Sequence, residues 1–143
     1  MSDKTMIGRV MLVDDEQIDQ MFYKRILQRS GFVTEIFGYT DAREAIAHLD
    51  NPDKPRVDLV LLDIRMPMMD GFEFLDAAEA HLGPKSRIPV VFMLTTSLSP
   101  NDRERAEENA CVNGYLTKPL TKEYMDTLAE LVEDVRRSHV EAS

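Results

Sequence analysis

Short apolar segments alternate with amphipathic segments along most of the chain. The first apolar segment, Val10–Val13, stops at an acidic cluster at residues 14–16. Residues 17–29 then carry apolar side chains at spacings of three and four, which is typical of a helix, and Gly31 provides a helix stop. The beginning of the chain therefore predicts a strand, a loop and a helix in succession.

The same unit recurs along the rest of the chain. Further strands are expected at residues 33–39, 57–63, 89–94 and 114–117, and further helices at residues 42–49, 71–80, 100–110 and 121–135. Thr40 and Thr121 are the expected N-caps of two of these helices. The segment 57–63 is nearly continuous in apolar residues, as a central parallel strand covered on both faces would be. The pattern predicts an α/β fold, a doubly wound parallel sheet of five strands flanked by five helices, with ligands bound beyond the carboxyl ends of the strands.

Composition and length limit the classes of protein that need to be considered. The 143 residues suit one domain, with an N-terminal extension at residues 1–8, the domain at residues 9–138 and a C-terminal tail at residues 139–143, which leaves no room for an output domain. A net charge of −9 repels nucleic acid.

The first eight residues contain no long apolar run, so neither a signal peptide nor a membrane span is predicted and the cytoplasm is the expected compartment. The single cysteine, Cys111, has apolar neighbours and is expected to be buried.

Carboxylates end two of the predicted strands. Asp14 and Asp15 follow the first strand and Asp63 ends the third, so the three share one pocket if these strands are neighbours. Two unit charges about 5 Å apart repel by roughly 3 kcal/mol at an effective dielectric constant of about 20. A cation must offset this repulsion, and Mg²⁺ prefers hard oxygen ligands of this kind. The sequence therefore predicts a magnesium site at this edge of the sheet.

Two further strand ends bring an ammonium and a hydroxyl group to the same edge. Lys118 ends the fifth strand and could bind a phosphoryl oxygen, and Thr95 or its neighbour Thr96 ends the fourth. Taken singly, the aspartates could be helix caps, the lysine a solvated side chain and the threonines ordinary strand residues. Their occurrence together at four strand ends favours a functional site.

At this point the chain resembles the receiver domain of bacterial two-component response regulators, from about residue 9 to residue 135. The resemblance rests on four segments in a fixed order: Val13-Asp14-Asp15-Glu16, Leu61-Leu62-Asp63-Ile64-Arg65-Met66-Pro67-Met68-Met69-Asp70-Gly71, Leu94-Thr95-Thr96-Ser97 and Gly114-Tyr115-Leu116-Thr117-Lys118-Pro119. It implies the flavodoxin-like receiver fold with strand order 2-1-3-4-5. It also implies a single-domain, chemotaxis-receiver-like signalling protein rather than an enzyme acting on other substrates.

The resemblance assigns roles to the acidic residues and the lysine. Asp63 would be the phosphoacceptor, taking a phosphoryl group from a histidine kinase or a histidine phosphotransfer protein to form an acyl phosphate. Asp15 and Asp63 would bind Mg²⁺ directly, Asp14 would bind it through water, and the backbone carbonyl of Arg65 would complete the protein ligands; Mn²⁺ can substitute. Lys118 would neutralise charge on the phosphoryl group.

The resemblance also implies how the signal leaves the site. The hydroxyl of Thr95 would move to a phosphoryl oxygen and the ring of Tyr115 would turn inward, which would change the face formed by the fourth helix, fifth strand and fifth helix. Residues 97–101 are one residue longer than is usual, so Thr96 is the alternative switch residue. The peptide bond between Lys118 and Pro119 would be cis. The downstream partner is an unknown protein, and the domain would be a monomer or a phosphorylation-dependent dimer.

Two other classes of function compete with this interpretation. A constitutive interaction module would have lost phosphorylation, yet the acidic residues and Lys118 are all present. A flavodoxin-like electron carrier would need a loop of backbone donors for the flavin phosphate, which the acidic residues 14–16 would repel. A small Mg²⁺-dependent phosphatase would also use an aspartate nucleophile, and the order of the motifs and the lack of a cap domain argue against it.

Overall fold

The computed structural model describes residues 6–82, 89–96 and 99–142, with side chains described up to residue 138. Strands and helices alternate along these residues as the sequence predicts. The elements are β1 (Gly8–Val13), α1 (Gln17–Ser30), β2 (Val33–Tyr39), α2 (Ala42–Asp50), β3 (Leu59–Asp63), α3 (Gly71–Leu82), β4 (Val90–Thr95), α4 (Pro100–Glu108), β5 (Gly114–Thr117), the 3₁₀ turn η2 (Lys122–Tyr124) and α5 (Met125–Ala142).

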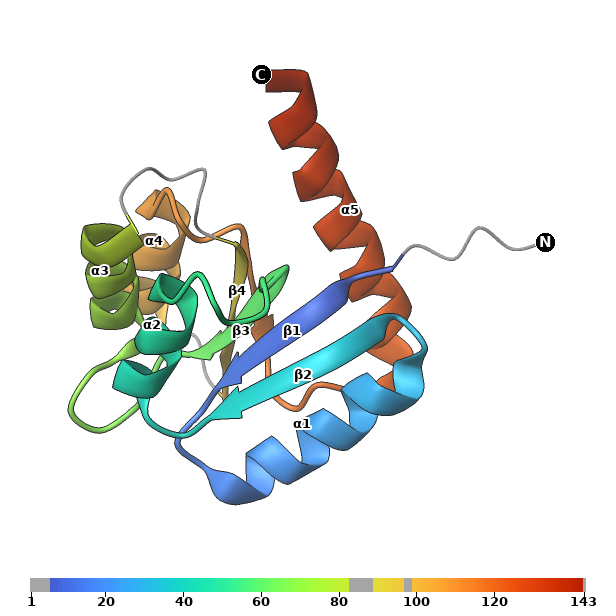
Figure 1. Cartoon of the computed structure of the whole chain (residues 1–143), viewed down its shortest axis with the longest axis horizontal. Coiled ribbons are helices and arrows are strands. Elements are labelled where there is room, and N and C mark those ends of the chain that lie inside the picture. Colours follow the sequence, from blue (N-terminus) through green and yellow to red (C-terminus); the bar gives the residue numbers. More distant parts are fainter. Residues whose placement is uncertain (1–5, 83–88, 97–98, 143) are drawn as a thin grey trace.

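The strands form one parallel sheet in the order β2-β1-β3-β4-β5, which confirms the predicted fold and strand order. Helices α1 and α5 cover one face of the sheet, and α2, α3 and α4 cover the other (Figure 1). The chain therefore forms three layers, with the loops that follow the strands gathered at one edge of the sheet.

The two faces of the sheet divide the core into two clusters. Along β1, Val10 and Leu12 point toward α1 and α5, whereas Met11 and Val13 point toward α2, α3 and α4. Such alternation is the ordinary consequence of the two-residue period of a strand. All five residues of β3 are buried, as expected for the strand at the centre of the sheet.

The ends of several helices differ from the sequence predictions. The N-cap of α2 is Asp41, one residue after the predicted Thr40, because the Asp41 carboxylate accepts a hydrogen bond from the backbone N–H of Arg43 at 2.9 Å. The predicted cap Thr121 does accept from the N–H of Tyr124, but the turn that it caps is η2, which leads into α5. Helix α4 ends at Glu108, two residues before the predicted end.

The beginning of the chain is tied to the last helix. Ile7 is buried in the core on the α1 and α5 side, and the Arg136 guanidinium donates hydrogen bonds to the carbonyls of Met6 and Ile7. The apolar stripe of α5 stops at Val135, but the helix continues to Ala142, so its last turns project beyond the sheet (Figure 1). The domain limits at residues 9 and 138 stay a prediction.

The packing of the core predicts that replacing two phenylalanines by alanine will have very different effects on the free energy of unfolding. Phe74 on α3 is 1% exposed, whereas Phe22 on α1 is 61% exposed. We expect Phe74→Ala to lower the free energy of unfolding by about 3–5 kcal/mol because it removes buried apolar surface and leaves a cavity. Phe22→Ala should change it by less than about 0.5 kcal/mol. Urea unfolding measures both values, and equal losses would contradict the packing of α3 described above.

Candidate functional site

Three carboxylates meet at the edge of the sheet where β1 and β3 end. Val13 pairs with Leu62, so the residues that follow β1 lie beside the last residue of β3. One oxygen from each of Asp14, Asp15 and Asp63 lies within 4.8 Å of the others. Asp14 and Asp63 are buried and Asp15 is half-buried. The predicted acidic pocket is therefore present, and its three oxygens are the kind that a hard divalent cation binds.

The residues after β3 are held close to this pocket. The backbone N–H of Arg65 donates to the Asp63 carboxylate at 3.3 Å, and the N–H of Gly71 donates to the carbonyl of Ile64 at 2.8 Å. A Cβ atom at Gly71 would lie 2.8 Å from the carbonyl oxygen of Asp63. Glycine is therefore required where α3 begins, because any side chain would push the helix away from β3.

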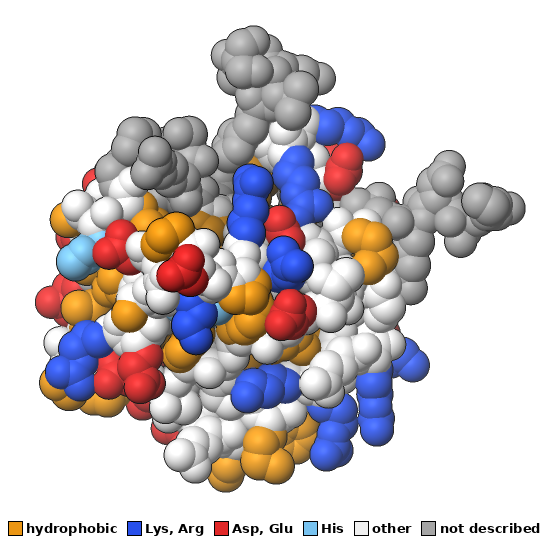
Figure 2. Space-filling view, viewed as in Figure 1, with side chains coloured by type: hydrophobic (Ala, Val, Ile, Leu, Met, Phe, Trp, Pro, Cys, Tyr) orange, Lys and Arg blue, Asp and Glu red, His pale blue; other side chains and the backbone are white. Residues whose placement is uncertain are grey.

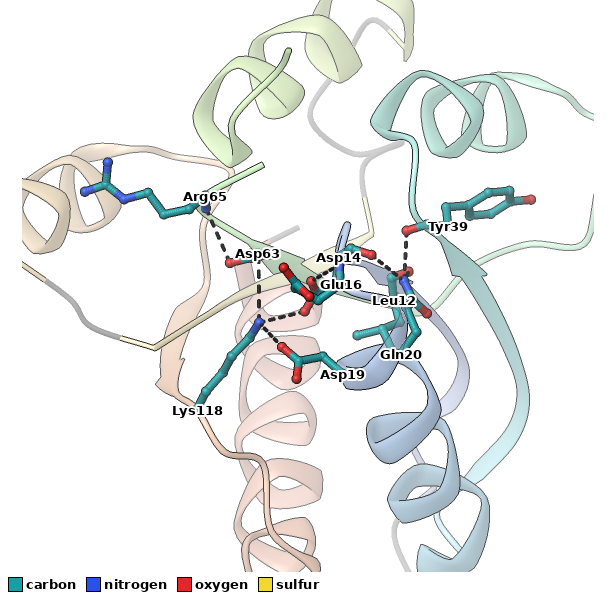
Figure 3. Close-up of polar contacts among 9 residues, drawn as sticks. All are labelled: Leu12, Asp14, Glu16, Asp19, Gln20, Tyr39, Asp63, Arg65 and Lys118. Atoms are coloured by element: carbon teal, nitrogen blue, oxygen red, sulfur yellow. Dashed lines mark hydrogen bonds and ion pairs between the residues drawn. The ribbon is translucent and has the colours of Figure 1, made fainter. Parts of the chain in front are cut away.

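Lys118 reaches the pocket from the loop after β5. Its Nζ lies 2.7 Å from Asp14 Oδ2 and 3.7 Å from Asp63 Oδ2, and its side chain is 6% exposed (Figure 3). The Lys118–Pro119 peptide bond is cis, as the resemblance implies, and the backbone N–H of Lys118 donates to the carbonyl of Thr95. The lysine is thus a nearly buried cation among carboxylates.

Asp19 is a member of the site that the sequence analysis missed. It lies in the first turn of α1, and its Oδ2 accepts a hydrogen bond from Lys118 Nζ at 2.9 Å (Figure 3). The only signal in the sequence is an aspartate in the helix that follows the acidic loop. Helix geometry alone does not say which side of the first turn faces a lysine almost one hundred residues away.

Gln20 was also missed, and it holds the loop that carries two of the aspartates. Its side-chain amide donates to the carbonyls of Leu12, Asp14 and Tyr39 at 3.1, 3.0 and 2.9 Å (Figure 3). These contacts join α1 to the ends of β1 and β2. A buried glutamine among apolar helix residues gives no sequence signal of this role.

The surroundings of the pocket raise the pKa of both Asp63 and Lys118, which favours the protonated form of each. Burial raises the pKa of Asp63 from 3.8 to about 6; the positive charge of Lys118 acts against this rise, and the charge of Asp14 adds to it. Burial opposes the charged form of Lys118, yet its hydrogen bonds to Asp14 and Asp19 raise the pKa of its ammonium above the ordinary value. The site therefore holds a permanent cation beside a carboxylate that is costly to ionise.

The predicted switch residues lie at the end of β4 and on β5. Thr95 ends β4 and is 2% exposed, whereas Thr96 is exposed. The hydroxyl of Tyr115, on β5, donates to the Glu107 carboxylate on α4 at 3.1 Å, and the Arg103 guanidinium lies over the tyrosine ring. Ser97, part of the third motif segment, lies outside the described residues.

Arg65 connects the loop after Asp63 to α4. Its side chain points away from the acidic pocket (Figure 3), and its guanidinium forms an ion pair of 2.7 Å with Asp102 in the first turn of α4. The Asp102 side chain is buried and the Arg65 side chain is largely exposed. This pair was not predicted, and it joins the loop after Asp63 to the neighbouring helix.

A parallel sheet with an acidic pocket, a buried lysine and a threonine at the carboxyl ends of its strands defines a receiver-type signalling domain. The chain matches the response regulator receiver domain family over residues 10–130 and belongs to that family. Receiver domains are signalling modules of two-component systems that accept phosphoryl groups from histidine kinases. The family therefore agrees with the resemblance seen in the sequence.

Several known proteins are similar over most of the chain. Response regulator Rcp1 from Synechocystis is 37% identical over 124 residues and 82% of each chain. The probable methanogenesis regulatory protein FilR2 from Methanothrix harundinacea is 35% identical over 89% of this chain and 80% of its own. A two-component response regulator structure from Cytophaga hutchinsonii has a TM-score of 0.78 and 30% identity over 90% of this chain and 98% of that one.

Other similar proteins place the domain in different contexts. The receiver domain of sensor histidine kinase PA1611 from Pseudomonas aeruginosa shares the fold, with a TM-score of 0.71 and 22% identity over 87% of this chain and 97% of that one. That structure has a magnesium ion coordinated in its active-site cleft. This chain also matches longer proteins, including a sensor histidine kinase from Helicobacter pylori, and it spans 14 to 17% of their length.

The raised pKa of Asp63 predicts a pH-dependent effect of Asp63→Asn. Without metal, the unfolded chain releases this proton near pH 3.8 and the folded protein near pH 6, so the ionised aspartate destabilises the fold increasingly between these values. The substitution should therefore raise the free energy of unfolding at pH 7 by up to about 3 kcal/mol, and by much less near pH 4.

Urea unfolding in the presence of a chelator measures this effect at both pH values. The exposed loop residue Asp53 provides the control, since Asp53→Asn removes a charge that lies outside the pocket. A gain of the same size at pH 4 and pH 7 would contradict the assignment of the effect to ionisation of Asp63.

Proposed function

We propose that this domain takes a phosphoryl group onto Asp63 from a histidine kinase or a histidine phosphotransfer protein, in a reaction that requires Mg²⁺. The observation that carries the proposal is the convergence of Asp14, Asp15, Asp63 and Lys118 at one end of the sheet. This arrangement supplies a nucleophile, oxygen ligands for a cation and a fixed positive charge. Phosphoryl transfer needs these three components and little else.

The cation site would be formed by the acidic pocket and one backbone group. Asp15 and Asp63 would bind the cation directly, Asp14 through water, and the carbonyl of Arg65 would be the remaining protein ligand. The close approach of three carboxylate oxygens supports a divalent cation, since they repel one another without one. When bound, the cation would offset negative charge on the phosphoryl oxygens. The magnesium ion in the PA1611 receiver domain supports this choice of metal, and Mn²⁺ should substitute.

Transfer would proceed by direct displacement at phosphorus. An oxygen of the ionised Asp63 forms the new bond to phosphorus while the bond from phosphorus to the donor histidine breaks, and the histidine nitrogen keeps the electron pair. The product is an acyl phosphate on Asp63. Lys118 Nζ, now 3.7 Å from Asp63 Oδ2, would donate to an oxygen of the transferred group.

The signal would leave the site through β4, β5 and α4. Thr95 is buried at the end of β4, so its hydroxyl is the better candidate to move toward the phosphoryl group than that of exposed Thr96. The bond from Tyr115 to Glu107 and the pair between Arg65 and Asp102 both end on α4. A change at Asp63 would therefore alter the face formed by α4, β5 and α5, which we propose as the surface that controls an unknown downstream protein.

The donor would approach beside α1. Ile18, Met21 and Phe22 are exposed on this helix, which begins next to the acidic loop. Hydrophobic side chains reach the surface along the lower edge of the molecule, where α1 lies (Figure 2). An exposed apolar group of this kind supports a protein partner.

None of the helices in the described ranges has the length and apolar character needed to cross a membrane. The cytoplasm is the proposed location, and the domain would act as a monomer or a phosphorylation-dependent dimer.

Incubation with acetyl phosphate tests the proposed chemistry directly. We expect the intact mass to rise by one phosphoryl group, about 80 Da, only when Mg²⁺ is present, and a chelator to prevent the gain. Asp63→Asn should abolish labelling, whereas the exposed-residue control Asp53→Asn should retain it. Labelling that persists in Asp63→Asn would disprove the acceptor assignment. If the wild type neither gains mass nor binds beryllofluoride, a phosphorylation-independent interaction module becomes the better interpretation.

Two adjacent threonines provide a matched test of the switch. Thr95→Ala should still bind beryllofluoride at Asp63 but lose most of the resulting NMR shift changes in residues 99–117. Thr96→Ala should keep those changes, because its side chain is exposed rather than buried beside the pocket. The reverse result would assign the switch to Thr96.

A further inference from the structure

Lys118 contacts carboxylates from a loop, a strand and a helix: it donates hydrogen bonds to Asp14 and Asp19 and forms a longer ion pair with Asp63. Two of its contacts, to Asp14 and Asp63, belong to the acidic pocket. The third, to Asp19, comes from the first turn of α1 and approaches the ammonium from the side away from Asp63 (Figure 3). Asp19 therefore binds the lysine without belonging to the group of carboxylates that could hold the cation.

The hydrogen-bonding capacity of the ammonium makes this contact important. A lysine ammonium has three donors. Two of them are engaged by Asp14 at 2.7 Å and Asp19 at 2.9 Å, and both contacts are shorter than the 3.7 Å to Asp63. The third donor is left for an oxygen of a phosphoryl group on Asp63, but the two short contacts hold the ammonium away from Asp63. The phosphoryl group would therefore have to draw Lys118 away from these two carboxylates.

The surrounding structure fixes where Asp19 lies. The next residue, Gln20, is anchored to the carbonyls of Leu12, Asp14 and Tyr39, so the first turn of α1 cannot move away from the pocket freely. The Asp19 side chain itself is 32% exposed, so its carboxylate can turn toward water when the lysine leaves it. The helix keeps the negative charge near the site, while the side chain can release its partner.

We propose that Asp19 is a positioning residue that holds Lys118 on the α1 side of the pocket and slows phosphorylation of Asp63 by competing with the phosphoryl group for that lysine. The inference rests on the proposed function, because it concerns the rate of the same transfer. Asp14 is needed for the cation, so Asp19 is the partner of Lys118 whose removal leaves the metal ligands intact. Its charge also repels an anionic donor.

The test compares charge-neutralising variants of two similar aspartates. Asp19→Asn should speed the Mg²⁺-dependent labelling by acetyl phosphate and tighten beryllofluoride binding, each by about fivefold, the factor expected from one partly exposed ion pair. Asp41→Asn is the matched control: Asp41 is 38% exposed and pairs with Arg43 instead of Lys118. Asparagine is an equally good N-cap, so this control should leave the rate unchanged. Asp19→Glu, which keeps the charge, should return the rate toward that of the wild type.

Rescue by a charge-conserving variant separates this role from a merely structural one. Asp19→Glu keeps a carboxylate that can bind Lys118, so its labelling rate should lie closer to that of the wild type than the rate of Asp19→Asn does. If Asp19→Asn is labelled no faster than the wild type, or if Asp19→Glu is labelled as fast as Asp19→Asn, the inference is overturned while the proposed function stands. If the wild type takes up no phosphoryl group, the proposed function fails and the inference fails with it.

Discussion

The unequal numbers of charges at the carboxyl end of the sheet are the constraint on which the rest of the site depends. Four carboxylates, from Asp14, Asp15, Asp19 and Asp63, lie around the single ammonium of Lys118. The parallel sheet brings most of these groups together, because residues that end or follow neighbouring strands emerge at the same edge, and the first turn of α1 adds Asp19. The lysine satisfies part of the excess charge, and burial keeps the pKa of Asp63 raised to about 6. The site formed by the fold therefore has more negative groups than positive ones.

A site with such an excess of negative groups is suited to signalling. A pocket whose charges were already balanced would gain little from a cation or a phosphoryl group, whereas the charge balance of this one would change if either were bound. Lys118 is central because its contacts come from α1, β3 and the loop after β1, so moving it would alter three segments at once. The energy needed for a conformational change can then come from the redistribution of hydrogen bonds at a single ammonium.

The route from this pocket to the surface is short. The backbone N–H of Arg65 donates to the Asp63 carboxylate and its guanidinium donates to Asp102 of α4, so one residue contacts both Asp63 and the helix. Thr95 joins the same system through its carbonyl, which accepts from the N–H of Lys118. In the proposed mechanism, a displacement of the loop after Asp63 would reach α4 through this ion pair, whose acidic partner is buried.

The sequence by itself determined the α/β architecture, the strand that ends in Asp63 and the acidic and basic residues at strand ends, because apolar periodicity and strand ends are local properties of the chain. It also led to the expectation that Cys111 is buried, which the structure bears out. Local patterns did not identify Asp41 as a cap in place of Thr40, since both are good caps and only backbone geometry chooses between them. The roles of Asp19, Gln20 and Asp102 were decided by tertiary structure alone. Each depends on partners brought close by the packing of α1 and α4 on the sheet, and no local pattern encodes that distance.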